Sequence, residues 1–146
     1  MLITITGMEL EHIEEVARIE QNTFSEPWTE QAFSDAVRSD NYLYITALDV
    51  DRVVGYAGCT ISLDEADITN IAVCADYKGN GIGEKLLKVL LGQLHERNVT
   101  KVFLEVRESN IVARSLYSKT GFAEVGIRKN FYRKPDENGV VMQLEI

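Results

Sequence analysis

The chain has few residues of the kinds that hold metals or form disulfide frameworks. It has only two cysteines, Cys59 and Cys74, and two histidines among 146 residues. The cysteines are not in C-x-x-C spacing, and neither histidine is close to them in the sequence. We therefore expect no metal site, and we expect both cysteines to be small buried apolar residues rather than nucleophiles.

Long apolar runs are also missing. No apolar stretch approaches the length of a membrane-spanning helix. The chain does not start with a basic segment followed by an apolar one, as a signal peptide does. These absences predict a soluble, cytoplasmic protein with no membrane partner.

Basic residues are scarce relative to acidic ones. The chain has 15 Lys and Arg against 23 Asp and Glu, a formal net charge of -8. No basic stripe follows any predicted element, which argues against nucleic acid as a partner. The acidic charge suits a cationic substrate, such as an amine or a basic peptide, but solubility alone explains it equally well.

The length and composition are those of one globular unit. A hydrophobic fraction of 45% over 146 residues predicts a single domain, residues 1–146, with one sizeable core. The sequence shows no linker, repeat or low-complexity segment. It does not indicate the oligomeric state.

The order of the predicted elements indicates an α+β fold. The strand over 101–106 follows a helix as in a β-α-β crossover, so it should pair parallel with the strand before that helix. The result is a mixed, mostly antiparallel seven-stranded sheet with a central parallel pair and about four flanking helices. We expect strands over residues 2–6, 42–48, 53–63, 66–73, 101–106, 123–132 and 140–145, with turns at 49–52 and 135–139. We expect helices over 9–22 and 82–97, a helix capped by Thr29 that includes Val37, and a last helix capped by Asn110 that ends before Gly121.

A glycine-rich segment, Tyr77-Lys-Gly-Asn-Gly-Ile-Gly83, connects an apolar strand to the third helix. The alternate glycines Gly79, Gly81 and Gly83 let backbone N–H groups point into one concavity. The N-terminus of the following helix adds its dipole, so the segment suits a diphosphate group. A tight strand-to-helix connection with no ligand is the alternative.

The residues of this segment do not match two familiar nucleotide-binding motifs. Lys78 and Lys85 supply local positive charge in an acidic protein. A P-loop ends in Gly-Lys-Ser/Thr, and a Rossmann fingerprint needs a third glycine where this chain has Glu84. The segment is therefore neither a P-loop nor a Rossmann fingerprint.

Three motifs together are more specific than the glycines alone: Asn70-Ile71-Ala72-Val73, Lys78-x-x-Gly81-x-Gly83, and Asn110…Tyr117…Gly121-Phe122. They resemble the GNAT superfamily of acetyl-CoA-dependent N-acetyltransferases, over essentially the whole chain. The family's loop usually starts with Gln or Arg, and Lys78 keeps the charge without the planar fork. The resemblance implies the GNAT fold and acetyl-CoA as cosubstrate, held by Ile71, Ala72, Val73, Lys78, Gly79, Asn80, Gly81, Ile82, Gly83, Asn110 and Tyr117.

Further segments are similar to the bacterial ribosomal-protein-alanine N-acetyltransferases. They are Pro27-Trp28, Leu63-Asp-Glu-Ala66, Leu104-Glu-Val-Arg-x-Ser-Asn110 and Arg128-x-Asn-Phe-Tyr132. The similarity implies acetylation of the α-amino group of an arginine-rich small-subunit ribosomal protein that begins with alanine. Trp28, Glu105, Phe131 and Tyr132 are the candidate acceptor-peptide residues, although plain packing also explains the aromatic ones.

The resemblance assigns the two steps of proton transfer to Glu105 and Tyr117. Glu105, at the end of a parallel strand, takes the proton of the attacking amine, directly or through water. An α-amine, with a pKa of about 7.7–8.0, needs only a modest base. Tyr117 protonates the departing CoA thiolate. The alternatives are an ion pair of Glu105 with Arg107 or another cation, and a core position for Tyr117.

Other residues and functions remain open from the sequence. Asn110 caps a helix and also reaches the cofactor's pantetheine or phosphate arm, or caps the helix only. Asp64 and Glu65 attract a substrate arginine or form a solvated turn. The alternatives to an N-terminal acetyltransferase are a GNAT enzyme for a small amine or a lysine side chain, and a non-catalytic CoA-binding module.

Overall fold

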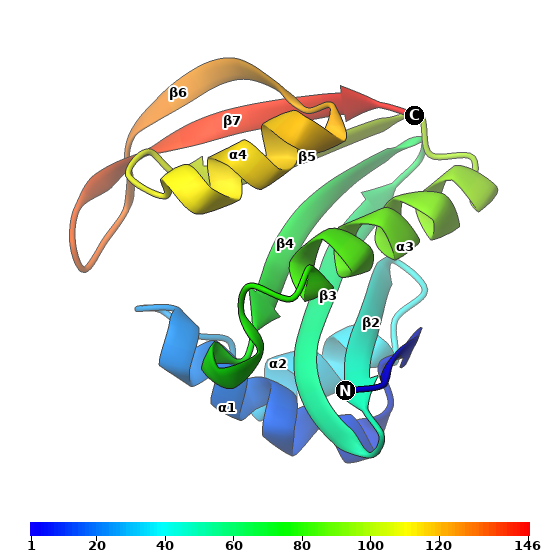
Figure 1. Ribbon diagram of the computed structural model, residues 1–146. Helices are drawn as coiled ribbons and strands as arrows, with labels where there is room; N and C mark the ends of the chain where they lie inside the picture. The colour runs from blue at the N-terminus through cyan, green and yellow to red at the C-terminus, as the bar shows by residue number, and fades with distance from the viewer.

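The structure, a computed structural model that describes residues 1–146, is one mixed sheet with helices on both faces (Figure 1). The strand order is β1-β2-β3-β4-β5-β7-β6, and only β4 and β5 pair in parallel. The predicted seven-stranded sheet with a central parallel pair is confirmed. The strands are β1 (Ile3–Gly7), β2 (Tyr42–Asp49), β3 (Arg52–Ser62), β4 (Glu65–Val73), β5 (Lys101–Arg107), β6 (Ala123–Tyr132) and β7 (Glu137–Glu145).

The four predicted helices are confirmed as α1 (Ile13–Thr23), α2 (Glu30–Val37), α3 (Ile82–Glu96) and α4 (Ile111–Thr120). Their ends follow the predicted capping chemistry. The Thr29 hydroxyl accepts from Ala32 N–H at 3.1 Å, and the Asn110 side chain accepts from Ala113 N–H at 3.1 Å. Gly121 ends α4 in the left-handed conformation, with φ 114°.

Several predicted boundaries are wrong by a few residues. The first helix is split into a 3₁₀ turn, Leu10–His12, and α1. β7 starts at Glu137 rather than at Val140, because Gly139 and its neighbours already pair with β5 and β6. The turn predicted at 49–52 is shorter, since β2 and β3 pair up to Asp49 and Arg52.

The helices cover the two faces of the sheet and make two cores. α3 and α4 pack on one face around a cluster that includes Leu86, Leu90 and Tyr117. α1 and α2 pack on the other face around a second cluster that includes Val16 and Phe33. Strand β3 sends side chains to both cores, as alternation along a strand requires. None of the helices has the length and apolarity needed to cross a bilayer.

β4 and β5 separate soon after they start. They pair over only three residues each, ending at Asp67 opposite Phe103. β4 also carries a bulge, because Gly58 pairs with Asn70 and Cys59 with Ile68, which leaves Thr69 without a partner in β3. Figure 1 shows the two strands diverging toward their carboxyl ends. We call the diverging parts, residues 68–73 and 104–107, the fork.

The bulge depends on the glycine opposite it, Gly58. A Cβ atom at position 58 would stand 2.1–2.3 Å from three ring atoms of the buried Tyr44. The Tyr44 hydroxyl bonds the side chains of Thr69 and Asn70, at 2.7 and 2.6 Å, so the ring is held in place. Gly58 is therefore the residue that makes room for the ring that supports the bulge.

We expect Gly58→Ala to lower the free energy of unfolding by about 3 kcal/mol, from overpacking and loss of the Tyr44 hydrogen bonds. Urea denaturation measures this change. Gly126→Ala, in exposed β6 with no atom within 4 Å of the new Cβ, is the control and should be nearly neutral. Equal stability of the two variants would mean that the Tyr44 ring is free to move.

Candidate active site

The fork leaves backbone groups of β4 without a partner. Cys74 N–H donates to the Val54 carbonyl at 2.7 Å, which makes 74 and 54 a hydrogen-bonded antiparallel pair. By alternation, Ile71 and Val73 direct their N–H and C=O groups away from β3, toward the fork. β5 does not reach them, because its pairing with β4 ends at Phe103. A ligand with amide groups can extend the sheet there, as the sequence predicts for pantetheine.

The glycine loop after β4 presents free N–H groups. Gly79 and Gly81 have φ of 82° and 76°, the left-handed conformation that favours glycine. The N–H groups of Gly79, Asn80 and Gly81 donate to no protein acceptor. The first N–H groups of α3, from Ile82 onward, are free by helix geometry. These free N–H groups fit a diphosphate, and anion binding by them stays a prediction.

Gly83 differs from the other two glycines. It lies within the first turn of α3, and its φ is not positive. A Cβ there would stand 3.7 Å from Leu116 and 3.8 Å from Val73, which is ordinary contact. Gly83 thus marks the place where α3, the end of β4 and α4 come together, rather than a bend of the loop.

Lys78 and Lys85 were predicted to supply positive charge at the loop, but only Lys78 is free to do so. Lys85 donates to the carbonyl of Ile3 at 3.2 Å, so its ammonium is bound to β1. Lys78 is exposed. Glu84 forms ion pairs with Lys88 at 3.1 Å and with Lys119 of α4 at 3.2 Å, and these bonds lower the pKa of its carboxyl. The two lysines neutralise the one acidic residue in the first turn of α3.

Glu105 lies on the arm of the fork that belongs to β5, facing α1 and α2. Its neighbours Leu104 and Val106 are buried in the α3–α4 core, and alternation turns the half-buried Glu105 to the other face. Its Oε1 atom is 3.3 Å from Arg128 Nε. Burial raises the pKa of Glu105, Arg128 opposes this, and Asp67 adds to it. The ion pair considered for Glu105 exists, but with Arg128 instead of Arg107.

Arg107 is a residue whose role the sequence did not reveal. Its guanidinium donates to the carbonyls of Arg133 and Pro135 at 2.8 and 2.9 Å, and it pairs with Glu137 at 3.3 Å. It also donates to the Ser25 hydroxyl at 3.2 Å. Arg107 therefore joins the end of β5 to the α1–α2 loop and to the β6–β7 turn, which flank Glu105.

Tyr117 lies on the opposite face from Glu105. Its ring is 5% exposed and packs edge-on against Phe122 at 5.8 Å. Its hydroxyl has no hydrogen-bond partner in the protein. Because no fully buried side-chain oxygen lacks a partner, this hydroxyl reaches solvent at an opening. Burial raises the pKa of Tyr117, so the hydroxyl stays protonated at neutral pH.

Tyr132 is a second tyrosine close enough to interact electrostatically with both Glu105 and Tyr117. Burial and the nearby Glu105 carboxylate raise the pKa of Tyr132 to about 12. Tyr132 in turn contributes to the raised pKa of Tyr117. The Arg107 guanidinium lies 4.7 Å from the centre of its ring. Tyr132 was predicted only as a peptide contact, but its position makes its hydroxyl a second candidate proton donor.

The other candidate acceptor residues are aromatic and lie at the surface. Trp28 is half-buried, with its ring 5.3 Å from Phe33 and 5.7 Å from Tyr44. Phe131 is 45% exposed and stacks edge-on against Tyr132 at 5.0 Å. These contacts explain the positions of the rings, and peptide binding by them stays a prediction.

The structure also places the two cysteines and Asp64. Cys59 is buried as predicted, but the prediction for Cys74 is wrong, because it is only partly buried, with Arg52 Nη2 3.6 Å from its sulfur. Asp64 accepts from the Thr100 hydroxyl at 3.1 Å. No group of three or more His, Cys, Asp or Glu side chains is arranged to hold a metal ion.

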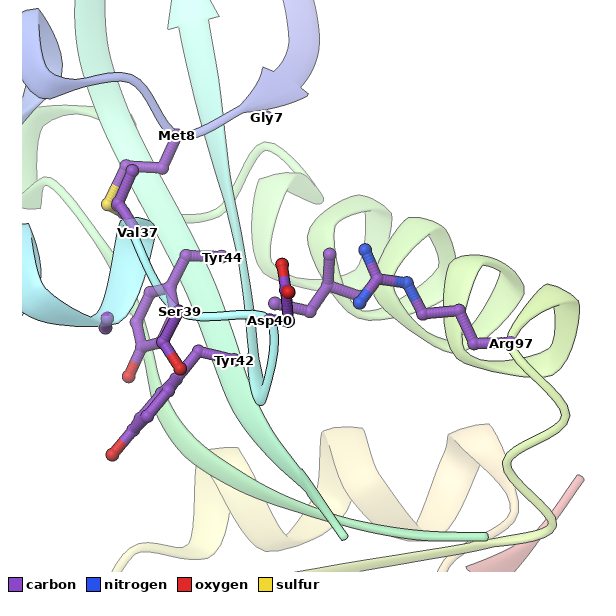
Figure 2. Close-up of a pocket in the computed structure, with 10 residues that line it drawn as sticks. Gly7, Met8, Val37, Ser39, Asp40, Tyr42, Tyr44 and Arg97 are labelled. Carbon is purple, nitrogen blue, oxygen red and sulfur yellow. The ribbon is translucent and has the colours of Figure 1, made fainter. Parts of the chain in front are cut away.

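A pocket of about 410 Å³ lies between α2, β2 and the end of β1, and one of its lining residues is Tyr44, whose hydroxyl bonds Thr69 and Asn70 of the fork. Figure 2 shows the rings of Tyr42 and Tyr44 on one side of it and Asp40 and Arg97 on the other. Of the residues predicted for binding or catalysis, none lines this pocket. The candidate active site is therefore the fork and the glycine loop.

We expect Arg128→Ala to raise the pKa of Glu105. The guanidinium favours the ionised carboxylate, so removing it leaves burial and Asp67 unopposed. A ¹³C NMR titration of the Glu105 carboxyl measures the shift. Lys129→Ala, which removes the neighbouring exposed charge without touching Glu105, is the matched control. An unchanged or lowered pKa in Arg128→Ala would contradict this assignment.

Comparison with known proteins identifies related sequences along nearly the whole chain. A model of the Acetyltransferase (GNAT) family matches residues 13–122. The chain is 42% identical over 141 residues to the ribosomal protein bS18-alanine N-acetyltransferase of Haemophilus influenzae, covering 94% of this chain and 95% of that protein.

Solved structures share the same fold. The crystal structure of the ribosomal-protein-S18-alanine N-acetyltransferase from Escherichia coli has a TM-score of 0.92 at 35% identity, covering 99% of this chain and 94% of that one. Ard1 from Thermoplasma volcanium has a TM-score of 0.91 at 28% identity, covering 100% and 99%. These similarities extend over the sheet, the fork and all four helices.

Proposed function

Because this chain belongs to the Acetyltransferase (GNAT) family, an acetyl-CoA-dependent class of enzymes, we propose that it acetylates the N-terminal α-amino group of a protein. The proposed acceptor is the alanine N-terminus of a small-subunit ribosomal protein. One observation carries the proposal: the fork is open, with Glu105 on one face and Tyr117 on the other, in a chain that matches bS18-alanine acetyltransferases along nearly its whole length.

The chain holds acetyl-CoA mainly with backbone groups. Bound acetyl-CoA supplies a thioester whose carbonyl accepts the amine. Gly79, Asn80 and Gly81, with the start of α3, offer N–H groups to its diphosphate. Ile71 and Val73 offer backbone groups to its pantetheine amides. Asn110, which caps α4, lies in the segment predicted to reach the same arm.

The two faces of the fork divide the proton transfers. Glu105 accepts a proton from the ammonium of the acceptor and passes it to solvent, which leaves a neutral amine to attack the thioester carbonyl and form the N–C bond. Its raised pKa improves it as a base, while Arg128 keeps it ionised. As the C–S bond breaks, Tyr117 gives its hydroxyl proton to the thiolate. The nitrogen loses two protons in all: the first goes through Glu105 to solvent before attack, and the second, lost as the amide forms, replaces the proton that Tyr117 gave to sulfur. The products are the amide, the CoA thiol and one released proton, with no acyl-enzyme.

The acceptor enters from the face of α1 and α2. The α1–α2 loop and the β6–β7 turn meet there through Ser25, which bonds Arg107 and the Arg133 carbonyl at 3.2 Å each. Asp67 and Glu105 place negative charge on this face. An arginine-rich N-terminus complements that charge, and it complements the net charge of -8.

A panel of acceptors with acetyl-CoA tests this function. We expect thiol release with an alanine-initiated, arginine-rich peptide, and none with the same peptide blocked at its α-amine. Preference for a polyamine or for a blocked, lysine-bearing peptide would move the assignment to another GNAT activity. Binding of acetyl-CoA with no acceptor acetylated would indicate a non-catalytic module.

A further inference from the structure

Glu20 is the only charged side chain among the buried residues, with an exposed fraction of 2%. It lies in α1 on the apolar face of Ile13, Val16 and Ala17, where an apolar residue is expected. No Lys, Arg or His pairs with it. Burying a carboxylate without a cation costs free energy. The hydrogen bonds of Glu20 therefore have a role other than packing.

Every partner of Glu20 is a hydrogen-bond donor. Its oxygens accept from the Tyr56 hydroxyl, from Asn70 Nδ2 at 3.1 and 3.2 Å, and from the Trp28 backbone N–H at 3.0 Å. Burial raises the pKa of Tyr56, so its hydroxyl keeps the proton that it donates. A carboxylate can accept from all of these groups at once, whereas the NH₂ group of an amide would meet the Trp28 or the Asn70 donor.

These donors come from different sides of the proposed active site. Asn70 follows the unpaired Thr69 in the bulge of β4, which is one arm of the fork. Trp28 belongs to the α1–α2 loop, which covers the acceptor face beside Glu105. Among residues 25–29, the Trp28 N–H is the only backbone donor with a protein acceptor. Glu20 is thus the one protein acceptor for the backbone N–H groups of that loop.

From this geometry we propose that Glu20 is a positioning residue, which fixes the acceptor loop at Trp28 relative to the β4 bulge and so aligns the incoming amine with the cofactor. The inference rests on the proposed function, since the loop must border the acceptor. It assigns no contact between Glu20 and either substrate. Its effect is transmitted through the Trp28 backbone and the Asn70 side chain.

Glu20→Gln tests this role with nearly unchanged shape. At the Oε2 position the new NH₂ group faces the Trp28 N–H and loses that bond, and at the Oε1 position it faces the Asn70 amide and leaves that amide only one oxygen to bond. We expect kcat/KM for the peptide to fall by about 10–100-fold, as small misplacements do, while the KM for acetyl-CoA is unchanged. Trp28 is the only tryptophan, so acrylamide quenching of its fluorescence should rise, and its amide should exchange faster.

Tyr56→Phe is the matched control. It removes one donor to Glu20 and lowers stability, but it leaves the bonds to Trp28 and Asn70. We expect wild-type Trp28 exchange and near wild-type peptide kinetics. If Glu20→Gln does not fold, Glu20→Asp, which keeps the charge but is one methylene shorter, replaces it with the same expectations.

The outcomes separate this inference from the proposed function. Wild-type Trp28 exchange in a folded Glu20→Gln, or peptide kinetics no worse than in Tyr56→Phe, would overturn the positioning role. If the wild-type protein acetylates no peptide, the proposed function fails. Amide exchange at Trp28 would then still decide whether Glu20 holds the loop.

Discussion

Glu105→Gln should reduce the turnover of an alanine-initiated peptide by about 10²–10⁴-fold, the usual contribution of a general base. The amide keeps the shape of the side chain but cannot take the proton of the ammonium. Acetyl-CoA affinity should be unchanged, because the glycine loop and β4 hold that ligand. Steady-state kinetics and isothermal calorimetry with acetyl-CoA measure the two effects.

The loss should be smaller at high pH, where the α-amine is already neutral. A peptide amine with a pKa of about 7.7–8.0 loses its proton without help above that range. Glu108→Gln, an exposed carboxyl three residues further on, is the control and should behave as the wild type. An equal loss at pH 7 and pH 9.5 would mean that Glu105 orients the acceptor and does not accept its proton.

Tyr117→Phe should also reduce turnover by about 10²–10⁴-fold, with acetyl-CoA affinity nearly unchanged. The Tyr117 hydroxyl has no partner in the protein, so its removal breaks no internal hydrogen bond, and the ring still packs against Phe122. Thermal unfolding should therefore match the wild type. This combination of a large kinetic effect and no stability effect is expected of a proton donor rather than of a core tyrosine.

Tyr132→Phe is the informative comparison for Tyr117. Both hydroxyls lack a protein partner, and both have a pKa raised by burial. A large loss in Tyr132→Phe with near-normal turnover in Tyr117→Phe would transfer the acid role to Tyr132. Loss of acetyl-CoA binding in Tyr117→Phe would instead make Tyr117 a cofactor contact.

The parts of the molecule that follow local rules were predictable from the sequence. Thr29, Asn110 and Gly121 mark helix ends through their own chemistry, and the leucines of α3 mark a buried face. The β-α-β order fixed the parallel pairing of β4 and β5. Family motifs then placed Glu105 and Tyr117, whose roles remain to be tested.

The parts that depend on distant contacts were not predictable. The bulge at Thr69 arises from the register between β3 and β4, which no single segment specifies. Arg107 follows Glu105 in the same motif, but its partners come from the α1–α2 loop and the β6–β7 turn. Glu20 could be noticed in the sequence as an acid at an apolar position of α1. Its role could not be predicted, because it depends on partners that are distant in the sequence.

In the proposed reaction, the fork transfers acetyl to an α-amine and not to a side chain. The direct test uses one alanine-initiated, arginine-rich peptide that also contains a lysine, incubated with acetyl-CoA and protein and sequenced by tandem mass spectrometry. We predict a single added acetyl group on the first residue, with the lysine unmodified. Acetyl on the lysine with a free N-terminus would contradict the assignment.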